Sequence, residues 1–194
     1  AASAIQAILT PGQQTRVLGA GATPSIETIS NAPSSDSLQR LKLQLARQAD
    51  RVFINPGTIS QNLLGDDVAG QVTIIKGDPS ADLNQGLDTA ADTTLEGTGH
   101  GSGILVVTGQ LTMRGSYRFD GAVILVGDGS RLTLEGNAAI FGSVLIANRT
   151  ARNSGRAGFA MKERAQLHFS QEALRGAGRL LSATLRVWQE MIDD

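Results

Sequence analysis

Residues 103–148 read GILVVTGQLTMRGSYRFDGAVILVGDGSRLTLEGNAAIFGSVLIAN, and this stretch decides the fold. Aliphatic runs recur in and around it at intervals of 19 and 21 residues, and runs that end in glycine recur at intervals of 18 and 21. The first kind begins at Ile104, Val123 and Val144, and the second begins at Thr93, Leu111 and Leu132. Because the two kinds alternate along the chain, the sequence predicts one structural repeat of about 20 residues.

Each repeat divides into three short strands with glycine at the corners. One unit comprises residues 111–115, 117–121 and 122–126, and the next comprises 132–136, 138–142 and 143–147. Such units are typical of a β-solenoid, in which each coil buries its inner face only when a neighbour stacks on it. We therefore predict a mainly β fold, a small β-solenoid or β-helix-like stack of about three coils. An antiparallel meander is the alternative, because glycine corners also suit hairpins.

Alternation within the glycine-ended runs predicts which side chains point inward. The residues expected on the core side are Leu111, Met113, Leu132 and Leu134. The polar residues between them are expected outside, and coils stacked in register would place Arg114 beside Glu135.

An amphipathic helix is predicted near residues 36–50 and is expected to pack on the β-stack. Its apolar positions recur every three or four residues, at Leu38, Leu41, Leu45, Ala49 and Val52. Ser34, Ser35 and Asp36 supply capping oxygens before it, and Pro56-Gly57 ends the segment.

The chain is expected to form one compact unit in three parts. Residues 1–58 hold a connector and the helix, residues 59–175 hold the β-repeat, and residues 176–194 form a C-terminal extension. A length of 194 residues agrees with one domain, since domains commonly span about 100–200 residues.

Composition excludes several classes of function. The chain has no cysteine, so thiolate metal sites, cysteine nucleophiles and disulfide scaffolds are ruled out. With 17 Lys and Arg against 18 Asp and Glu, the net charge of −1 provides no basic field for nucleic acid. Glycine is abundant, with 23 residues, and only seven residues are aromatic, which favours tight turns and thin aliphatic layers.

The block 103–128, continued by residues 140–147, resembles the soluble region of PilX-type type IV pilus assembly proteins. Upstream, VTIIKGD at 72–78 looks like the first repeat of that family, and FSQEAL at 169–174 matches a later element with Phe in place of Tyr. The resemblance covers roughly residues 36–175, and the block 103–147 carries most of its specificity.

This resemblance implies a non-enzymatic structural or priming component of a type IV pilus or pseudopilus. It also implies an extracytoplasmic location, at the periplasm or cell surface, with an inner-membrane anchor ahead of Ala1 in the full-length protein. Pilin-like or pilus assembly proteins are then the expected partners, and self-association is possible. The resemblance supplies no catalytic residues and no cofactor.

The residues themselves offer little catalytic chemistry. His100 and Ser102 are neighbours in a glycine-rich stretch that lacks an orienting base, which argues against a nucleophile. His100 and His168 are far apart in sequence and lack helical spacing, which argues against zinc. The aspartates of residues 66–92 make calcium the alternative to no cofactor, although they lack the spacing of a known calcium loop.

Two other functions remain as alternatives. Asp120, Asp128 and Glu135 lie near predicted corners, where clustered acids would suit a polysaccharide-binding or polysaccharide-cleaving β-helix. Asp before Gly in a turn explains two of these acids without chemistry. A bactofilin-like self-polymerising scaffold would also have short aliphatic coils.

An uneven charge distribution indicates a candidate interaction surface. Residues 66–97 hold seven acids and one base, whereas residues 149–194 hold eight bases and five acids. Opposite charges of this kind can steer contact between subunits, although they can also compensate one another within the chain. The candidate residues are Asp66, Asp67, Asp78, Asp82, Arg149, Arg152 and Arg156.

Overall fold

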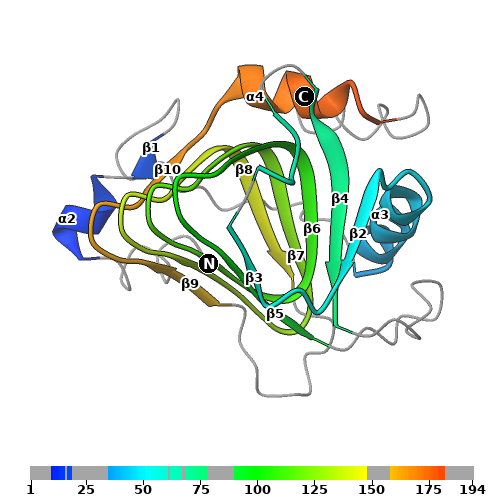
Figure 1. Cartoon of the computed structure of the whole chain (residues 1–194), viewed down its shortest axis with the longest axis horizontal. Coiled ribbons are helices and arrows are strands. Elements are labelled where there is room, and N and C mark those ends of the chain that lie inside the picture. Colours follow the sequence, from blue (N-terminus) through cyan, green and yellow to red (C-terminus); the bar gives the residue numbers. More distant parts are fainter. Residues whose placement is uncertain are drawn as a thin grey trace.

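The computed structural model describes residues 10–15, 17–18, 35–60, 62–66, 69–77, 90–147 and 158–181. This part of the chain is mainly β and forms one ten-stranded sheet that curves around a common interior (Figure 1). Its strands, in chain order, are β1 (Val17–Leu18), β2 (Arg51–Ile54), β3 (Thr58–Ile59), β4 (Gln71–Lys76), β5 (Ala91–Leu95), β6 (His100–Met113), β7 (Arg118–Leu134), β8 (Ala139–Ala147), β9 (Gly158–Met161) and β10 (Gln166–His168). Its helices are α2 (Pro11–Gln14), α3 (Ser35–Arg47) and α4 (Gln171–Gly178).

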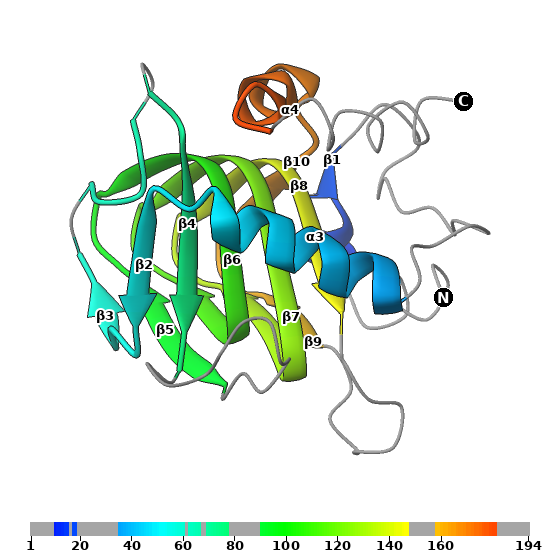
Figure 2. The ribbon, with the colours of Figure 1, turned by 90° about the vertical axis from the view of Figure 1, so that its right-hand side faces the viewer.

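All the strand pairs of the described residues are parallel, so the antiparallel meander is wrong. The main path runs β1-β10-β8-β7-β6-β4-β2, and Figure 2 shows these strands side by side. Equivalent residues of successive strands therefore form rows, such as Gly103, Gly121 and Gly142. The register shifts once between β6 and β7, where Thr108 and Gln110 pair with Val126 and Arg131.

The row Gly103, Gly121 and Gly142 shows why glycine recurs at this corner. All three residues have positive φ, of 112°, 140° and 144°. A Cβ at Gly121 would fall on the carbonyl oxygen of Gly103, and one at Gly142 would fall on that of Gly121. Backbones of neighbouring strands therefore pack against each other in space that any side chain would fill.

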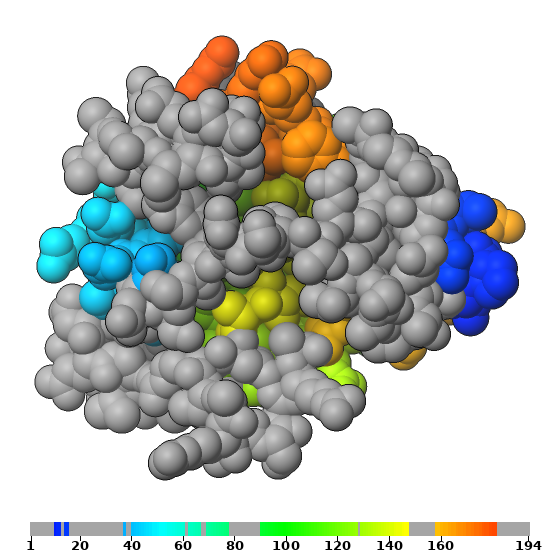
Figure 3. Space-filling view, turned by 180° about the vertical axis from the view of Figure 1, so that it is seen from behind, coloured from blue at the N-terminus to red at the C-terminus, as the bar shows by residue number. Residues whose placement is uncertain are grey.

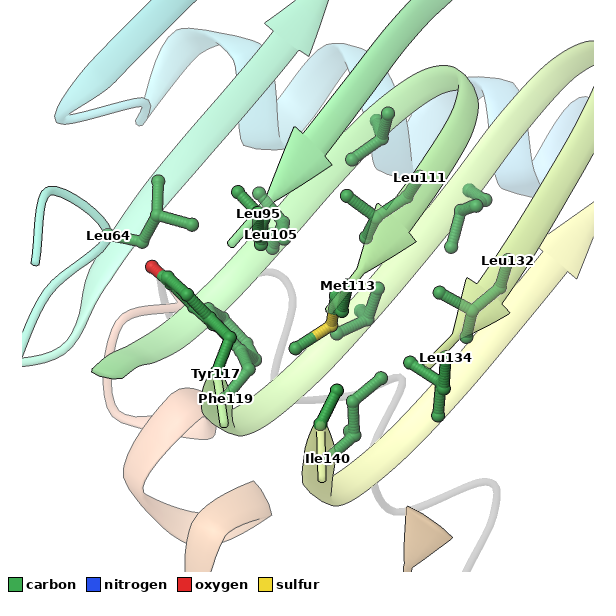
Figure 4. Close-up of a cluster of buried hydrophobic side chains, with 14 of the residues drawn as sticks. Leu64, Leu95, Leu105, Leu111, Met113, Tyr117, Phe119, Leu132, Leu134 and Ile140 are labelled. Atoms are coloured by element: carbon green, nitrogen blue, oxygen red, sulfur yellow. The ribbon is translucent and has the colours of Figure 1, made fainter. Parts of the chain in front are cut away.

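The main core fills the space that the sheet encloses, and its side chains point toward one another (Figure 4). The predicted inward positions Leu111, Met113, Leu132 and Leu134 are all fully buried there, which confirms the alternation. The ring of Tyr117 is also buried, in space left open by Gly99, since a Cβ at that glycine would overlap the ring.

A second apolar cluster lies on the outer face of the sheet. Its strand members are Val72, Ile74, Ile104, Val106 and Val126. Leu41 and Leu45 of α3 and Ala177 of α4 belong to the same cluster. Both faces of β4 are thus buried, and its sequence QVTIIK reads as a nearly continuous apolar run for this reason.

The helix predicted near residues 36–50 is confirmed as α3, but its apolar stripe ends earlier than the sequence suggests. The amide of Gln48 donates to Leu45 O, and the Asp50 carboxylate accepts from the amide of Val72 at 2.8 Å. These contacts turn the chain into β2, where Val52 pairs with Ile74 of β4 instead of extending the helix. At the other end of the described chain, Ser170 caps α4, and its side chain accepts a hydrogen bond from the amide of Ala173.

One end of the sheet is formed by β2, the last strand of the path, which Figure 2 shows beyond β4. Seen from behind, β8 is visible near the centre, with α4 above it and α2 at the side (Figure 3). Within the described ranges, no helix has the length and apolar character needed to cross a bilayer.

Candidate functional site

The structure describes one of the seven residues of the predicted charged surface. Asp66 is exposed, and its Oδ1 accepts a hydrogen bond from the amide of Ala69 at 2.8 Å. The other six, namely Asp67, Asp78, Asp82, Arg149, Arg152 and Arg156, lie outside the described residues. The charged surface therefore stays a prediction.

A different group of polar and aromatic side chains gathers on the outer side of β6, β7, β8 and β10. Parallel register places them in two neighbouring rows. The first row contains His100, Arg118, Ala139 and Gln166, and the second contains Ser102, Asp120, Phe141 and His168. We call these eight residues the histidine face. It brings both histidines of the chain to one surface, although their sequence positions suggest no relation.

Asp120 is the central acid of the histidine face. Its carboxylate accepts two hydrogen bonds from Arg118, from Nε at 2.8 Å and from Nη2 at 2.7 Å. The Nε2 atom of His100 lies 3.3 Å from Asp120 Oδ2. The Asp120 side chain is only 17% exposed, and its carboxylate lies between the guanidinium of Arg118 and the imidazole of His100.

Planar groups stack along the same face. The Arg118 guanidinium carbon lies 4.3 Å from the centre of the Phe141 ring, a cation–π contact. The ring of His168 stacks on Phe141 with centroids 4.6 Å apart and planes 6° apart, and His168 Nε2 lies 2.9 Å from Gln166 Oε1. Three successive strands are thus joined by one stack of planar side chains.

A second outer row is built from charges of alternating sign. It follows β5, β6, β7 and β9 and contains Glu96, Arg114, Glu135 and Lys162. Arg114 Nε donates to Glu96 Oε2 at 2.6 Å, and Lys162 Nζ lies 2.5 Å from Glu135 Oε1. The predicted neighbours Arg114 and Glu135 directly follow the adjacent strands β6 and β7, but each forms its ion pair with a residue on its other side.

The described residues do not form the catalytic pairs that were considered from the sequence. The Ser102 hydroxyl donates to the carbonyl oxygen of Asp66, while His100 contacts Asp120. Asp120 and Glu135 are held in separate ion pairs, and the side chain of Asp128 lies outside the described residues. Over the described part of the chain, no three His, Cys, Asp or Glu side chains come together as metal ligands.

The open edge of β2 is a second candidate site. Val52 and Ile54 are 48% and 46% exposed, so large aliphatic side chains face solvent at this edge. Among the described residues, β2 pairs only with β4. Arg51 Nη1 donates to Leu63 O at 3.2 Å, so the charge of Arg51 is held at this same end of the sheet.

A shallow hollow of about 430 Å³ lies near α2. Its lining residues are Thr10, Gly12, Glu163, Arg164 and Gln166. The side chains that line it are polar and largely exposed, and they include one acid and one base. The hollow therefore lacks the apolar, enclosed character of a typical small-molecule site.

Sequence reasoning missed the histidine face and the open edge for different reasons. Arg118 and Phe141 meet only through the register of β7 and β8, which requires the repeat to be aligned residue by residue. That alignment was available in the sequence, since Gly121 and Gly142 mark equivalent corners. Val52 was instead assigned to the helix stripe, which hid its place on an edge strand.

No protein family model, curated protein or solved structure matches this chain.

Proposed function

We propose that the chain is a β-solenoid that acts as a non-enzymatic structural or priming component of a type IV pilus-like assembly. In this proposal, α3 packs along one side of the stack, and successive passes of the chain are its coils. The same block, 103–147, both carries the resemblance to PilX-type proteins and supplies most of the stacked strands.

The structural role is supported by outer polar side chains that link neighbouring strands. The ion pairs Glu96–Arg114 and Glu135–Lys162 each join one strand to its neighbour. Arg118, Phe141 and His168 likewise join three strands through stacking. Side chains that hold neighbouring strands together favour a passive, stiff element over a site where substrate must displace existing contacts.

The pilus context rests on the sequence resemblance. It supports a location outside the cytoplasm, at the periplasm or cell surface, with attachment to the inner membrane. Pilin-like or pilus assembly proteins are the proposed partners. The charged surface that includes Asp66 and Arg149 is a proposed contact, because opposite charges on two regions would orient subunits head to tail.

The direct test is deletion of the gene in the organism that encodes it, with surface pili counted by electron microscopy. We expect piliation to fall and to return when the wild-type gene is restored. Charge reversal at Arg149, Arg152 and Arg156 is expected to weaken cross-linking to pilin-like proteins, and added salt is expected to do the same. Normal piliation in the deletion strain would refute the pilus role.

A bactofilin-like scaffold is the second candidate, in which the open edge of β2 would supply one of the contacts between subunits and a contact elsewhere on the chain would extend the filament. An exposed strand edge with apolar side chains is a site where another chain can add a strand. Polysaccharide binding is supported less, because Arg118 covers one face of the Phe141 ring and His168 covers the other. Sugar rings usually stack on a free aromatic face, which Phe141 does not offer.

A further inference from the structure

The edge of β2 presents a specific set of backbone groups. In a parallel pair, alternate residues of a strand direct both the amide and the carbonyl toward the partner. The amide of Asn55 donates to Lys76 O of β4 at 2.7 Å, so the groups of Phe53 and Arg51 face β4 as well. The amides and carbonyls of Val52 and Ile54 therefore point away from β4, toward the open side.

These four groups are complementary to a copy of themselves. In an antiparallel pair, two opposed residues exchange two hydrogen bonds, and the next pair exchanges none. If Val52 stands opposite Ile54 of a second copy, then Ile54 stands opposite Val52 of that copy. All four outward groups of each strand are then satisfied, and Phe53 meets its own counterpart on the twofold axis.

We propose that two copies of this chain associate through an antiparallel pair of β2 strands in this register. The interface is isologous, so it closes as a dimer instead of growing into a filament. Val52 and Ile54 form cross-strand apolar pairs on the face where each is about half exposed. Arg51 stands opposite Asn55 of the second copy, so the register opposes no like charges.

Competing registers satisfy fewer groups. Moving the axis to Val52 would place Ile54 opposite Asp50 of the second copy, whose amide already donates to Val72 O at 2.9 Å. Self-pairing about Phe53 is the arrangement that the edge itself specifies, and it depends neither on the pilus proposal nor on the charged surface.

The test is the oligomeric state of the 194-residue chain, measured by analytical ultracentrifugation over a range of concentrations. We expect a monomer–dimer equilibrium in the wild type. Val52→Lys and Ile54→Lys should each raise the dissociation constant by at least about tenfold, since lysine on an edge strand opposes pairing. Phe169→Lys is the matched control, because Phe169 is also exposed, at 54%, but lies away from β2.

A cross-linking variant tests the register. The chain contains no cysteine, so Phe53→Cys introduces a single thiol at the proposed axis. Opposed residues of a non-hydrogen-bonded pair have Cα atoms about 4.5 Å apart, within the range of a disulfide. Oxidation should give a covalent dimer for Phe53→Cys and far less for Phe169→Cys.

Three results would overturn the proposal. The wild type staying monomeric at all concentrations is one, and both lysine variants retaining full dimerisation is another. Open-ended filaments, whose length grows with concentration, would show instead a heterologous end-to-end contact. If Phe53→Cys fails to fold, the two lysine variants still decide the question, because their side chains lie on the exposed face.

Discussion

The carbonyl oxygen of Gly103 occupies the space in which a side chain at Gly121 would have to begin. Gly121 lies in the middle of its row, with Gly103 on one side and Gly142 on the other. The φ of 140° at Gly121 adds a conformational cost for any other residue. The close approach of three strands at this corner thus depends on the absence of side chains.

Gly121→Ala is therefore expected to destabilise the fold by at least about 3 kcal/mol, because overlap with backbone cannot be relieved by rotating a side chain. Thermal unfolding followed by circular dichroism measures the change. Gly176→Ala in α4 is the matched control: a Cβ there meets nothing within 4 Å. This control should stabilise the helix by about 0.5–1 kcal/mol. Equal stability of both variants would contradict the close packing at Gly121.

Thr93→Val is expected to stabilise the protein by about 1 kcal/mol, because the buried Oγ1 of Thr93 has no hydrogen-bond partner among the described residues. Thr108 is a buried threonine of the opposite kind, since its Oγ1 donates to Ile75 O at 3.4 Å. Thr108→Val should leave stability unchanged or lower it. Denaturant midpoints of the two variants measure the difference, and a loss of stability in Thr93→Val would show that its hydroxyl does find a partner.

Burial raises the pKa of Tyr117 to about 12, from an ordinary value of 10.0. As the pH rises from about 10 toward 12, the unfolded chain releases this proton while the folded chain keeps it. The free energy of unfolding therefore falls, by about 1.4 kcal/mol for each unit of pKa difference. Denaturant unfolding at several alkaline pH values should show this loss in the wild type.

Tyr117→Phe removes that titration and also removes a buried hydroxyl that has no hydrogen-bond partner within the described ranges. This variant should be at least as stable as the wild type at neutral pH and should lose less stability above pH of about 10. Tyr117 is the single tyrosine of the chain, so tyrosinate absorbance follows its ionisation directly. Ionisation in the folded protein at the ordinary pKa would contradict its burial.

Arg114→Glu is expected to lower stability by about 1 kcal/mol at low salt, because the new acid would stand in the row between Glu96 and Glu135. Added salt should reduce this loss, because the charges are partly exposed. Arg114→Gln separates the two effects: it removes the bond to Glu96 without adding an acid. Urea unfolding at low and high salt measures both variants. If both variants were as stable as the wild type at low salt, the row of Glu96, Arg114, Glu135 and Lys162 would make no measurable contribution to stability.

The sequence predicted the mainly β fold and its inward residues because the signals are local. Leu132 and Leu134 alternate with polar residues, and period two is visible within five positions. The histidine face was not predicted, because Arg118, Phe141 and His168 meet only after three strands are aligned. Equal spacing cannot supply that alignment, since Asp120 pairs with Phe141 21 positions later, whereas Phe141 pairs with His168 27 positions later.

The edge of β2 was also beyond sequence reasoning. Val52 continues the three- and four-residue spacing of the helix, so periodicity alone assigns it to α3. The contact of the Asp50 carboxylate with the amide of Val72 breaks that continuity, and it joins residues that are 22 positions apart. A tertiary contact of this kind decides where the helix ends and leaves no local signal.

The register shift between β6 and β7 has a consequence for the length of the repeat. Val126 and Arg131 are five positions apart, whereas their partners Thr108 and Gln110 are two positions apart. The residues before and after this shift are nevertheless paired in register. At the glycine corner, by contrast, Gly103, Gly121 and Gly142 pair without any shift. The sheet therefore accepts extra residues at one corner, whereas the close backbone contacts of the glycine corner leave no room for them. A loop grafted between Val126 and Arg131 would lengthen the chain where β7 already carries extra residues and would leave the glycine corner unchanged.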